Sequence, residues 1–182
     1  MLDGVFHDGL KGQRRQAELR ELDDYADSFG IELIPCIQTL GHLTCIFKWE
    51  PYQRLQDCHN ILMPGEEGTY QLIEDMFKTL SKCISTKVIN IGLDEAHMVG
   101  RGRYYDRHGD IDKTTLLVQH VKRVAEIAAK YGFKVCMWSD MFFRIATGGK
   151  YYDSNVTVSE ELKAMIPDNV ELIYWDYYSD DV

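Results

Sequence analysis

The chain has 182 residues, 45% of them hydrophobic, which is enough to bury a sizeable core without disulfides or a structural metal. Its formal net charge is -9, and its Lys and Arg residues form no run that could follow a phosphate backbone, so neither nucleic acid nor an anionic membrane is an expected partner. No apolar stretch reaches the roughly 18 residues of a membrane span, and the first residues lack the apolar core of a signal peptide. We therefore expect a cytoplasmic protein.

The cysteines have no metal-binding spacing. They are scattered along the chain without a CxxC pair, at Cys36, Cys45, Cys58, Cys83 and Cys136. Cys36 and Cys136 lie within apolar runs, which predicts reduced thiols packed in a core. We expect neither a metal nor an organic cofactor.

Helical and strand-like segments alternate along the chain. Apolar residues keep helical spacing over residues 14–29, 70–84, 114–131 and 159–166. Short apolar runs typical of buried strands follow them at 31–37, 88–93, 134–138 and 171–175. Glycine after the first and third helices, at Gly30 and Gly132, is typical of a left-handed helix stop. This order predicts parallel strands joined by helical crossovers.

Two parallel architectures are compatible with this order, an open doubly wound sheet and a (β/α)8 barrel. The stretch "IPCIQTLGHLT" after the first predicted strand lacks the GxGxxG loop that often marks the open sheet. Polar and aromatic residues follow several strands, as in a barrel mouth, at Gln38, Asp94, Trp138 and Trp175. A complete barrel needs about 250 residues. We therefore predict an α/β fold that is a partial (β/α)8 TIM barrel, with residues 1–182 forming a single segment truncated at both ends.

The stretch "VINIGLDEAH" (88–97) ends a predicted strand in two adjacent carboxylates. Alternation along the strand directs Asp94 into the barrel mouth, and Glu95 follows where the strand opens into its loop. A glycosidase needs one carboxylic acid that stays protonated and a second group that stays anionic, and adjacent carboxylates push their titrations apart. The alternative is that the pair only caps a loop or the next helix.

Three stretches in order carry a resemblance to a known family. "INIGLDEAH" resembles the glycine-x-Asp-Glu signature of family 20 glycoside hydrolases, the β-N-acetylhexosaminidases. "GIELIPCIQTLGH" is similar to the earlier strand and Pro-Gly-His turn of that family, and "KVCMWSDM" to a later strand with a pocket tryptophan. The resemblance extends from about residue 14 to residue 178.

The resemblance implies substrate-assisted catalysis on glycosides of N-acetylated amino sugars. Glu95 would be the general acid and base. Asp94 would orient the 2-acetamido group of the substrate, whose carbonyl oxygen attacks the anomeric carbon and forms an oxazolinium intermediate that water opens with retained configuration. Asp94 would then stabilise the positive charge on the amide nitrogen.

The resemblance also implies substrate-binding residues. Trp138 and Trp175 would form apolar walls around the acetamido methyl group and the sugar ring, and Tyr177 is a candidate for binding hydroxyl groups. His42 matches a histidine that supports the acid through a hydrogen-bond relay. Gln38 stands where the family usually has Asp, and Gln cannot stabilise an imidazolium as Asp does.

Other polar residues keep two interpretations each. His97 lines the cleft or ties down the loop. Asp140 binds substrate or caps a helix that begins near residue 141, and capping is favoured. His59, His108 and His120 are predicted to be surface residues.

Two further hypotheses remain open for the function, and one for association. In the first, Asp140 or Asp176 is the nucleophile of an ordinary retaining glycosidase. In the second, the chain is a catalytically silent carbohydrate-binding fragment, since the resemblance implies that the first-strand arginine and the last-strand residues of the family have no counterparts here. Open barrel edges also predict association into a homodimer.

Overall fold

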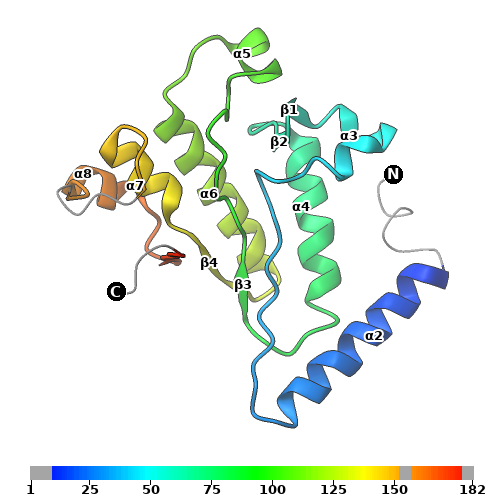
Figure 1. Ribbon diagram of the computed structural model, residues 1–182. Helices are drawn as coiled ribbons and strands as arrows, with labels where there is room; N and C mark the ends of the chain where they lie inside the picture. Colours follow the sequence, from blue (N-terminus) through cyan, green and yellow to red (C-terminus); the bar gives the residue numbers. More distant parts are fainter. Residues whose placement is uncertain (1–9, 152–156, 178–182) are drawn as a thin grey trace.

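The computed structural model describes residues 10–151 and 157–177, and its centre is a three-stranded parallel sheet (Figure 1). The strands are β3 (Val88–Asn90), β4 (Lys134–Trp138) and β5 (Val170–Ile173), with β4 in the middle. In register, Val88 faces Lys134 and Val135 faces Val170. The described chain is therefore a mixed α/β structure with parallel strands, as the sequence predicts.

Helices connect the strands on the way from one to the next. The β3–β4 connection contains α5 (Arg103–His108) and α6 (Lys113–Lys130), and the β4–β5 connection contains α7 (Asp140–Thr147) and α8 (Glu160–Met165). Before β3 lie α2 (Leu10–Asp27) and α4 (Glu67–Leu80). The four predicted helices thus exist as α2, α4, α6 and α8. None of the described helices is both long and apolar enough to cross a bilayer.

Local sequence signals explain where α6 begins and ends. Asp112 precedes the helix, and its carboxylate accepts the Thr115 N–H at 2.8 Å, which holds the pKa of Asp112 below its usual value. Gly132 follows the helix in the left-handed conformation, with φ +78°. The predicted glycine stop is confirmed here.

The predicted strand at 31–37 is wrong. This segment runs beside β3 but makes a single bridge, between Cys36 and Asn90, in which the Ile37 N–H donates to the Asn90 carbonyl at 2.9 Å. To extend the ladder, residue 35 would have to donate an N–H to the Val88 carbonyl, and Pro35 has none. Cys36 is consequently exposed at this edge and not packed in the core, whereas Cys136 is buried.

Short elements between α2 and α4 escape prediction because they are too short for a hydrophobic period to repeat recognisably. They are η1 (Ile46–Lys48), α3 (Glu50–Gln53), and an antiparallel pair of strands, β1 (Gln56–Cys58) and β2 (Ile61–Leu62). Together with α4 they bury a second, smaller cluster, formed by Phe47, Tyr52, Leu55, Leu62 and Leu72.

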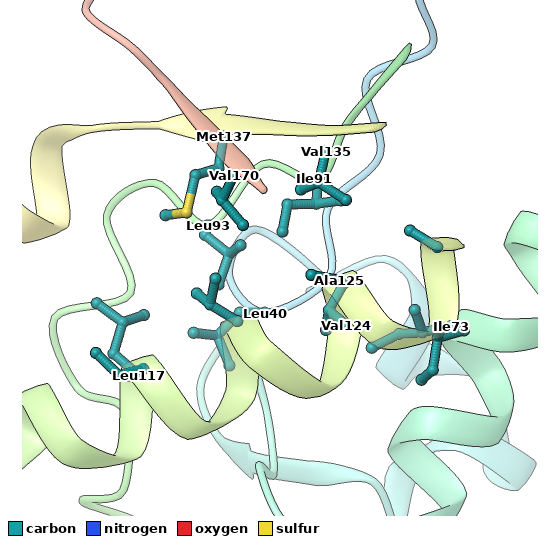
Figure 2. Close-up of a cluster of buried hydrophobic side chains, with 14 of the residues drawn as sticks. Leu40, Ile73, Ile91, Leu93, Leu117, Val124, Ala125, Val135, Met137 and Val170 are labelled. Atoms are coloured by element: carbon teal, nitrogen blue, oxygen red, sulfur yellow. The ribbon is translucent and has the colours of Figure 1, made fainter. Parts of the chain in front are cut away.

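The main core lies between the sheet and the pair α4 and α6. Ile89, Ile91 and Leu93 alternate along β3 and its continuation, and all three are fully buried. Figure 2 shows Ile91 and Leu93 directed towards α6, which carries Leu117 and Val124. This is the uniformly apolar face that alternation predicts, and its burial leaves the other face for Asn90 and the polar residues that follow.

The apolar stripe of α2 remains open. Leu22 and Tyr25 on α2 are 51% and 65% exposed, and Phe29, in the turn after the helix, is 64% exposed; these three residues form the α2 stripe. The helix α2 lies at the edge of the molecule in Figure 1. The helix is held elsewhere, because Leu19 packs against the main core and buried Asp23 accepts the Ser85 N–H at 2.8 Å.

His120 corrects another expectation, since it is fully buried on α6 and not at the surface. Its Nε2 donates to the Thr39 carbonyl at 3.1 Å, and its Nδ1 lies 3.4 Å from the Tyr70 hydroxyl. Burial lowers the pKa of His120 to about 4, so the ring is neutral at pH 7. His59 and His108 are exposed, as predicted.

Candidate active site

The two adjacent carboxylates lie on a sharply turned loop that follows β3. Gly92, Leu93 and Glu95 have φ angles of 71°, 73° and 53°, in the left-handed region that only glycine adopts at little cost. Leu93 is fully buried and anchors the turn. Asp94 and Glu95 therefore leave the core together, at the carboxyl end of the parallel sheet.

Asp94 has an N–H group within reach of each carboxylate oxygen. The Gln38 amide donates to Oδ1 at 2.7 Å, and His42 Nε2 lies 3.1 Å from Oδ2. The Gln38 hydrogen bond and the close imidazole nitrogen restrain the plane of the carboxylate from two directions.

His42 Nε2 also lies 3.6 Å from Glu95 Oε2, so one imidazole edge faces both acids. A close approach makes this possible: a Cβ on Gly41 would lie 2.9 Å from the Asp94 carbonyl oxygen. Only glycine therefore lets the turn that carries His42 pack against the loop of the acids.

The side chain of Gln38, which stands where the family usually has Asp, hydrogen-bonds Asp94 and not His42. As an amide, Gln38 supplies a donor to a carboxylate without adding a negative charge beside it. Its Oε1 is buried and has no hydrogen-bond partner among the described residues. The same atom occupies the space where a Cβ on Gly92 would lie, 2.3 Å away.

Asp140 does not cap α7. It is the first residue of that helix, after the N-cap Ser139, and its Oδ2 accepts the Glu95 N–H at 3.1 Å. The side chain is fully buried, with Arg144 Nε 3.7 Å away. Burial raises the pKa of Asp140, and the negative charge of Asp94 acts in the same direction. The helix cap was favoured because a capping position and a contact with a distant loop look alike in sequence.

His97 ties down the loop, and it also lines a cavity in whose walls neither Asp94 nor Glu95 takes part. Its backbone N–H donates to the Glu95 carbonyl at 2.8 Å, and its backbone carbonyl accepts a hydrogen bond from the Lys113 ammonium at 2.6 Å. Burial and the nearby Arg144 charge lower the pKa of His97. The cavity has a volume of about 440 Å³ and is lined by His97, Lys113, Met141, Arg144, Ile145, Gly148 and Gly149.

Trp138 lies at the end of β4 next to the carboxylate loop, where its backbone N–H donates to the Gly92 carbonyl at 3.1 Å. Trp138 lies beside the Cys36 thiol and acts to lower its pKa, but partial burial, with the charge of Asp94, raises that pKa overall. Cys36 is a neighbour of the site that sequence reasoning missed. The signal was available, because Cys36 and Gln38 are two residues apart and share a face of an extended segment.

Trp175 and Tyr177 gather with Tyr151 in an aromatic cluster after β5. The Trp175 ring centroid lies 4.9 Å from that of Tyr151 and 5.3 Å from that of Tyr177. The backbone N–H of Trp175 donates to the Tyr151 hydroxyl at 3.0 Å. This hydroxyl lies 3.2 Å from the hydroxyl of Ser139, the residue before Asp140. Contact of Trp175 and Tyr177 with a substrate stays a prediction.

Relatives of the chain share the name hexosaminidase. Hexosaminidase D from Bos taurus is 25% identical over 173 residues, which cover 90% of this chain and 47% of that protein. Hexosaminidase D from Homo sapiens is 24% identical over 174 residues, which cover 90% of this chain and 33% of that protein. The chain thus spans half or less of the length of these curated relatives.

Solved structures share the fold. The GH20 β-N-acetylhexosaminidase from Streptomyces coelicolor has a TM-score of 0.62 and 23% identity, over 91% of this chain and 29% of that chain. The model of the family described as glycosyl hydrolase family 20, catalytic domain, matches residues 7–177. This match covers nearly the whole chain and shows that it belongs to glycosyl hydrolase family 20.

Proposed function

We propose that this chain is a segment of the catalytic domain of a β-N-acetylhexosaminidase that removes terminal N-acetylglucosamine or N-acetylgalactosamine. The observation that carries the proposal is the pair Asp94 and Glu95, with Asp94 held by Gln38 and His42 and Glu95 open to solvent. Family membership supports the same reaction class. The parallel strands with helical crossovers, and the likeness to solved GH20 enzymes, support a partial (β/α)8 barrel as its architecture.

In this proposal Asp94 binds the acetamido N–H of the substrate. Its two oxygens have about four lone-pair sites, so the contacts with Gln38 and His42 leave room for a further donor. As the acetamido carbonyl oxygen attacks the anomeric carbon, the amide nitrogen becomes cationic, and a fixed anion stabilises that charge more than it stabilises the neutral ground state.

Glu95 is proposed to donate a proton to the departing glycosidic oxygen and then to take one from the water that opens the oxazolinium ring. Its side chain is 46% exposed, which suits a group that must reach both a leaving group and water. His42 Nε2 lies 3.6 Å from this carboxyl group and 3.1 Å from Asp94 Oδ2, so the imidazole is a close neighbour of Glu95 and not its hydrogen-bond donor.

The rival mechanism with a carboxylate nucleophile fits Asp140 poorly. A nucleophile must face the anomeric carbon, whereas the Asp140 carboxylate is fully buried and accepts a backbone N–H. Asp176 is then the candidate left for this rival, whose mark is turnover of sugars without an acetamide. We favour substrate-assisted attack, which requires no carboxylate nucleophile.

The test is hydrolysis of the nitrophenyl N-acetyl-β-glucosaminide beside the plain nitrophenyl β-glucoside. Glu95→Gln should lower turnover of the acetamido sugar by about 10²- to 10⁴-fold, or about 2.7–5.4 kcal/mol of transition-state stabilisation. Glu126→Gln is the matched control, because Glu126 is exposed on α6, and it should leave the rate unchanged.

Each other outcome has a defined meaning. An undiminished rate in Glu95→Gln would remove Glu95 as the acid, and equal turnover of the two sugars would remove the acetamide from the mechanism. Binding of the acetamido sugar without turnover would favour the silent carbohydrate-binding fragment.

A further inference from the structure

Glu95 holds a backbone conformation that a residue with a side chain rarely adopts. Its φ is 53°, and the turn before it already contains Leu93 at 73°. Such conformations persist only where surrounding contacts fix them, and they gather at functional sites. The groups that bond the Glu95 backbone therefore decide where its carboxyl group lies.

Both backbone groups of Glu95 are bonded. The carbonyl accepts the His97 N–H at 2.8 Å, a contact within the loop itself. The N–H donates to Asp140 Oδ2 at 3.1 Å, across 45 residues of chain. Only the Glu95 side chain is left 46% exposed, so a fixed backbone carries a reactive end that remains open to solvent.

Asp140 is itself held in place by the sheet. The Trp138 N–H donates to the Gly92 carbonyl at 3.1 Å, and the Ser139 N–H donates to the Ile173 carbonyl at 3.0 Å. Immediately before Asp140, the end of β4 is thus hydrogen-bonded on one side to the loop after β3 and on the other side to β5. A rigid strand end is a suitable mount for a group that must hold a loop.

The carboxylate of Asp140 is unfavourable for stability alone. It is fully buried, its Oδ1 has no hydrogen-bond partner among the described residues, and Arg144 Nε is 3.7 Å from Oδ2. Burial of an acid under these conditions disfavours its charged form. Within the described residues, the hydrogen bond that its carboxylate accepts comes from the Glu95 N–H, to Oδ2, while Oδ1 has no partner.

We propose that Asp140 is a positioning residue, which fixes the Glu95 backbone so that its carboxyl group meets the glycosidic oxygen. This inference rests on the proposed role of Glu95 as acid and base, and it gives Asp140 a role other than the helix cap or the substrate contact considered from sequence. Asp140 touches neither the sugar nor the reacting bond and acts through Glu95.

The first arm of the test is kinetic, with the nitrophenyl N-acetyl-β-glucosaminide as substrate. Asp140→Ala should lower kcat by about 10²-fold, the usual consequence of a misplacement near 1 Å, with little change in KM. Asp140→Asn should recover most of kcat, because its amide oxygen can still accept the Glu95 N–H. Asp168→Asn, at an exposed acid before β5, is the control and should behave as the unaltered chain.

The second arm is amide hydrogen exchange, which needs no turnover. The Glu95 amide should lose protection in Asp140→Ala and keep it in Asp140→Asn, while the buried Met137 amide of β4 stays protected in both. Unchanged Glu95 protection in the Ala variant would overturn the proposal. So would a rise in KM at constant kcat, or a loss of kcat in the Asn variant whose Glu95 amide remains protected. Absence of turnover in the unaltered chain would concern the proposed function of this segment and not the Asp140 contact, which the exchange arm tests by itself.

Discussion

Gly92 is the residue at which the backbone and the site depend on each other. It adopts φ +71°, and the space where its Cβ would lie is filled by the Gln38 amide that bonds Asp94. A side chain at this position would both strain the turn and displace a partner of Asp94. The absence of a Cβ at Gly92 therefore permits both the left-handed turn and the Gln38–Asp94 hydrogen bond.

This link predicts different effects of two glycine substitutions. Gly132 has φ +78° but open space around it, so Gly132→Ala should cost only the left-handed strain, about 1–2 kcal/mol. Gly92→Ala should cost more, because a Cβ would lie 2.3 Å from Gln38 Oε1, and it should lower turnover as well. Urea unfolding and the glycosidase assay on both variants measure the two effects. Equal stability losses with equal activity would show that Gln38 adjusts without consequence.

At the scale of elements, α6 supports the sheet and also reaches the loop that carries Gln38 and His42. Its buried His120 donates to the carbonyl of Thr39, the residue after Gln38. Because a carbonyl can only accept, Nε2 must carry the hydrogen, and Nδ1 is left to accept from the Tyr70 hydroxyl. The neutral ring satisfies both neighbours, while a charged ring would have a buried, uncompensated proton.

The buried ring predicts a loss of stability in mild acid. Its pKa is about 4 in the folded chain against 6.5 for an ordinary His, so below pH 6.5 the unfolded chain binds a proton that the folded chain does not. The stability that neutral His120 contributes to the folded chain is fully present above pH 6.5 and is lost as the pH falls towards 4. Between pH 7 and pH 5 the free energy of unfolding should fall by about 2 kcal/mol through this group.

Urea unfolding at the two pH values tests this prediction against two variants. His120→Asn should be less stable at pH 7 but should lack this share of the pH dependence. His59→Asn changes an exposed histidine and should keep the full dependence. The same slope in all three chains would assign the pH dependence to other groups.

At the scale of the whole molecule, the described chain leaves apolar surface and sheet edge uncovered. Within residues 10–151 and 157–177, β5 pairs only with β4, and an irregular segment with one bridge flanks β3. The exposed apolar stripe of α2 continues into exposed Ile31 and Ile34. Surfaces of this kind favour association with another polypeptide.

Self-association of the isolated chain is therefore the expected result of sedimentation velocity. The double substitution Tyr25→Lys and Phe29→Lys places charges on the α2 stripe and should shift the chain towards monomer. Trp49→Lys removes an aromatic side chain that is also exposed, outside this stripe, and should leave association unchanged. A monomer already present before any substitution would contradict the prediction of a homodimer.

How far the sequence predicts the molecule depends on the range of each signal. The helical spacing in α4 and α6 and the glycine stop at Gly132 are local, and the structure confirms them. The strand expected at 31–37 is absent because its pairing requires an N–H that Pro35 lacks, and a proline within an apolar run is a local signal. His120 stands three residues after Leu117 and four before Val124, so local helical spacing also places it on the buried face. The bond from the Glu95 N–H to Asp140, in contrast, depends on which loop packs against α7.

The sequence by itself determined the alternation of helices and strands, the buried face of β3 and the adjacency of Asp94 and Glu95. These properties follow from periods of a few residues and from covalent order. The tertiary structure decided that Gln38 bonds Asp94, 56 residues away, and that Asp140 bonds the Glu95 N–H, 45 residues away. Partners at such separations are selected by how the whole core packs, and no local pattern of residues encodes that selection.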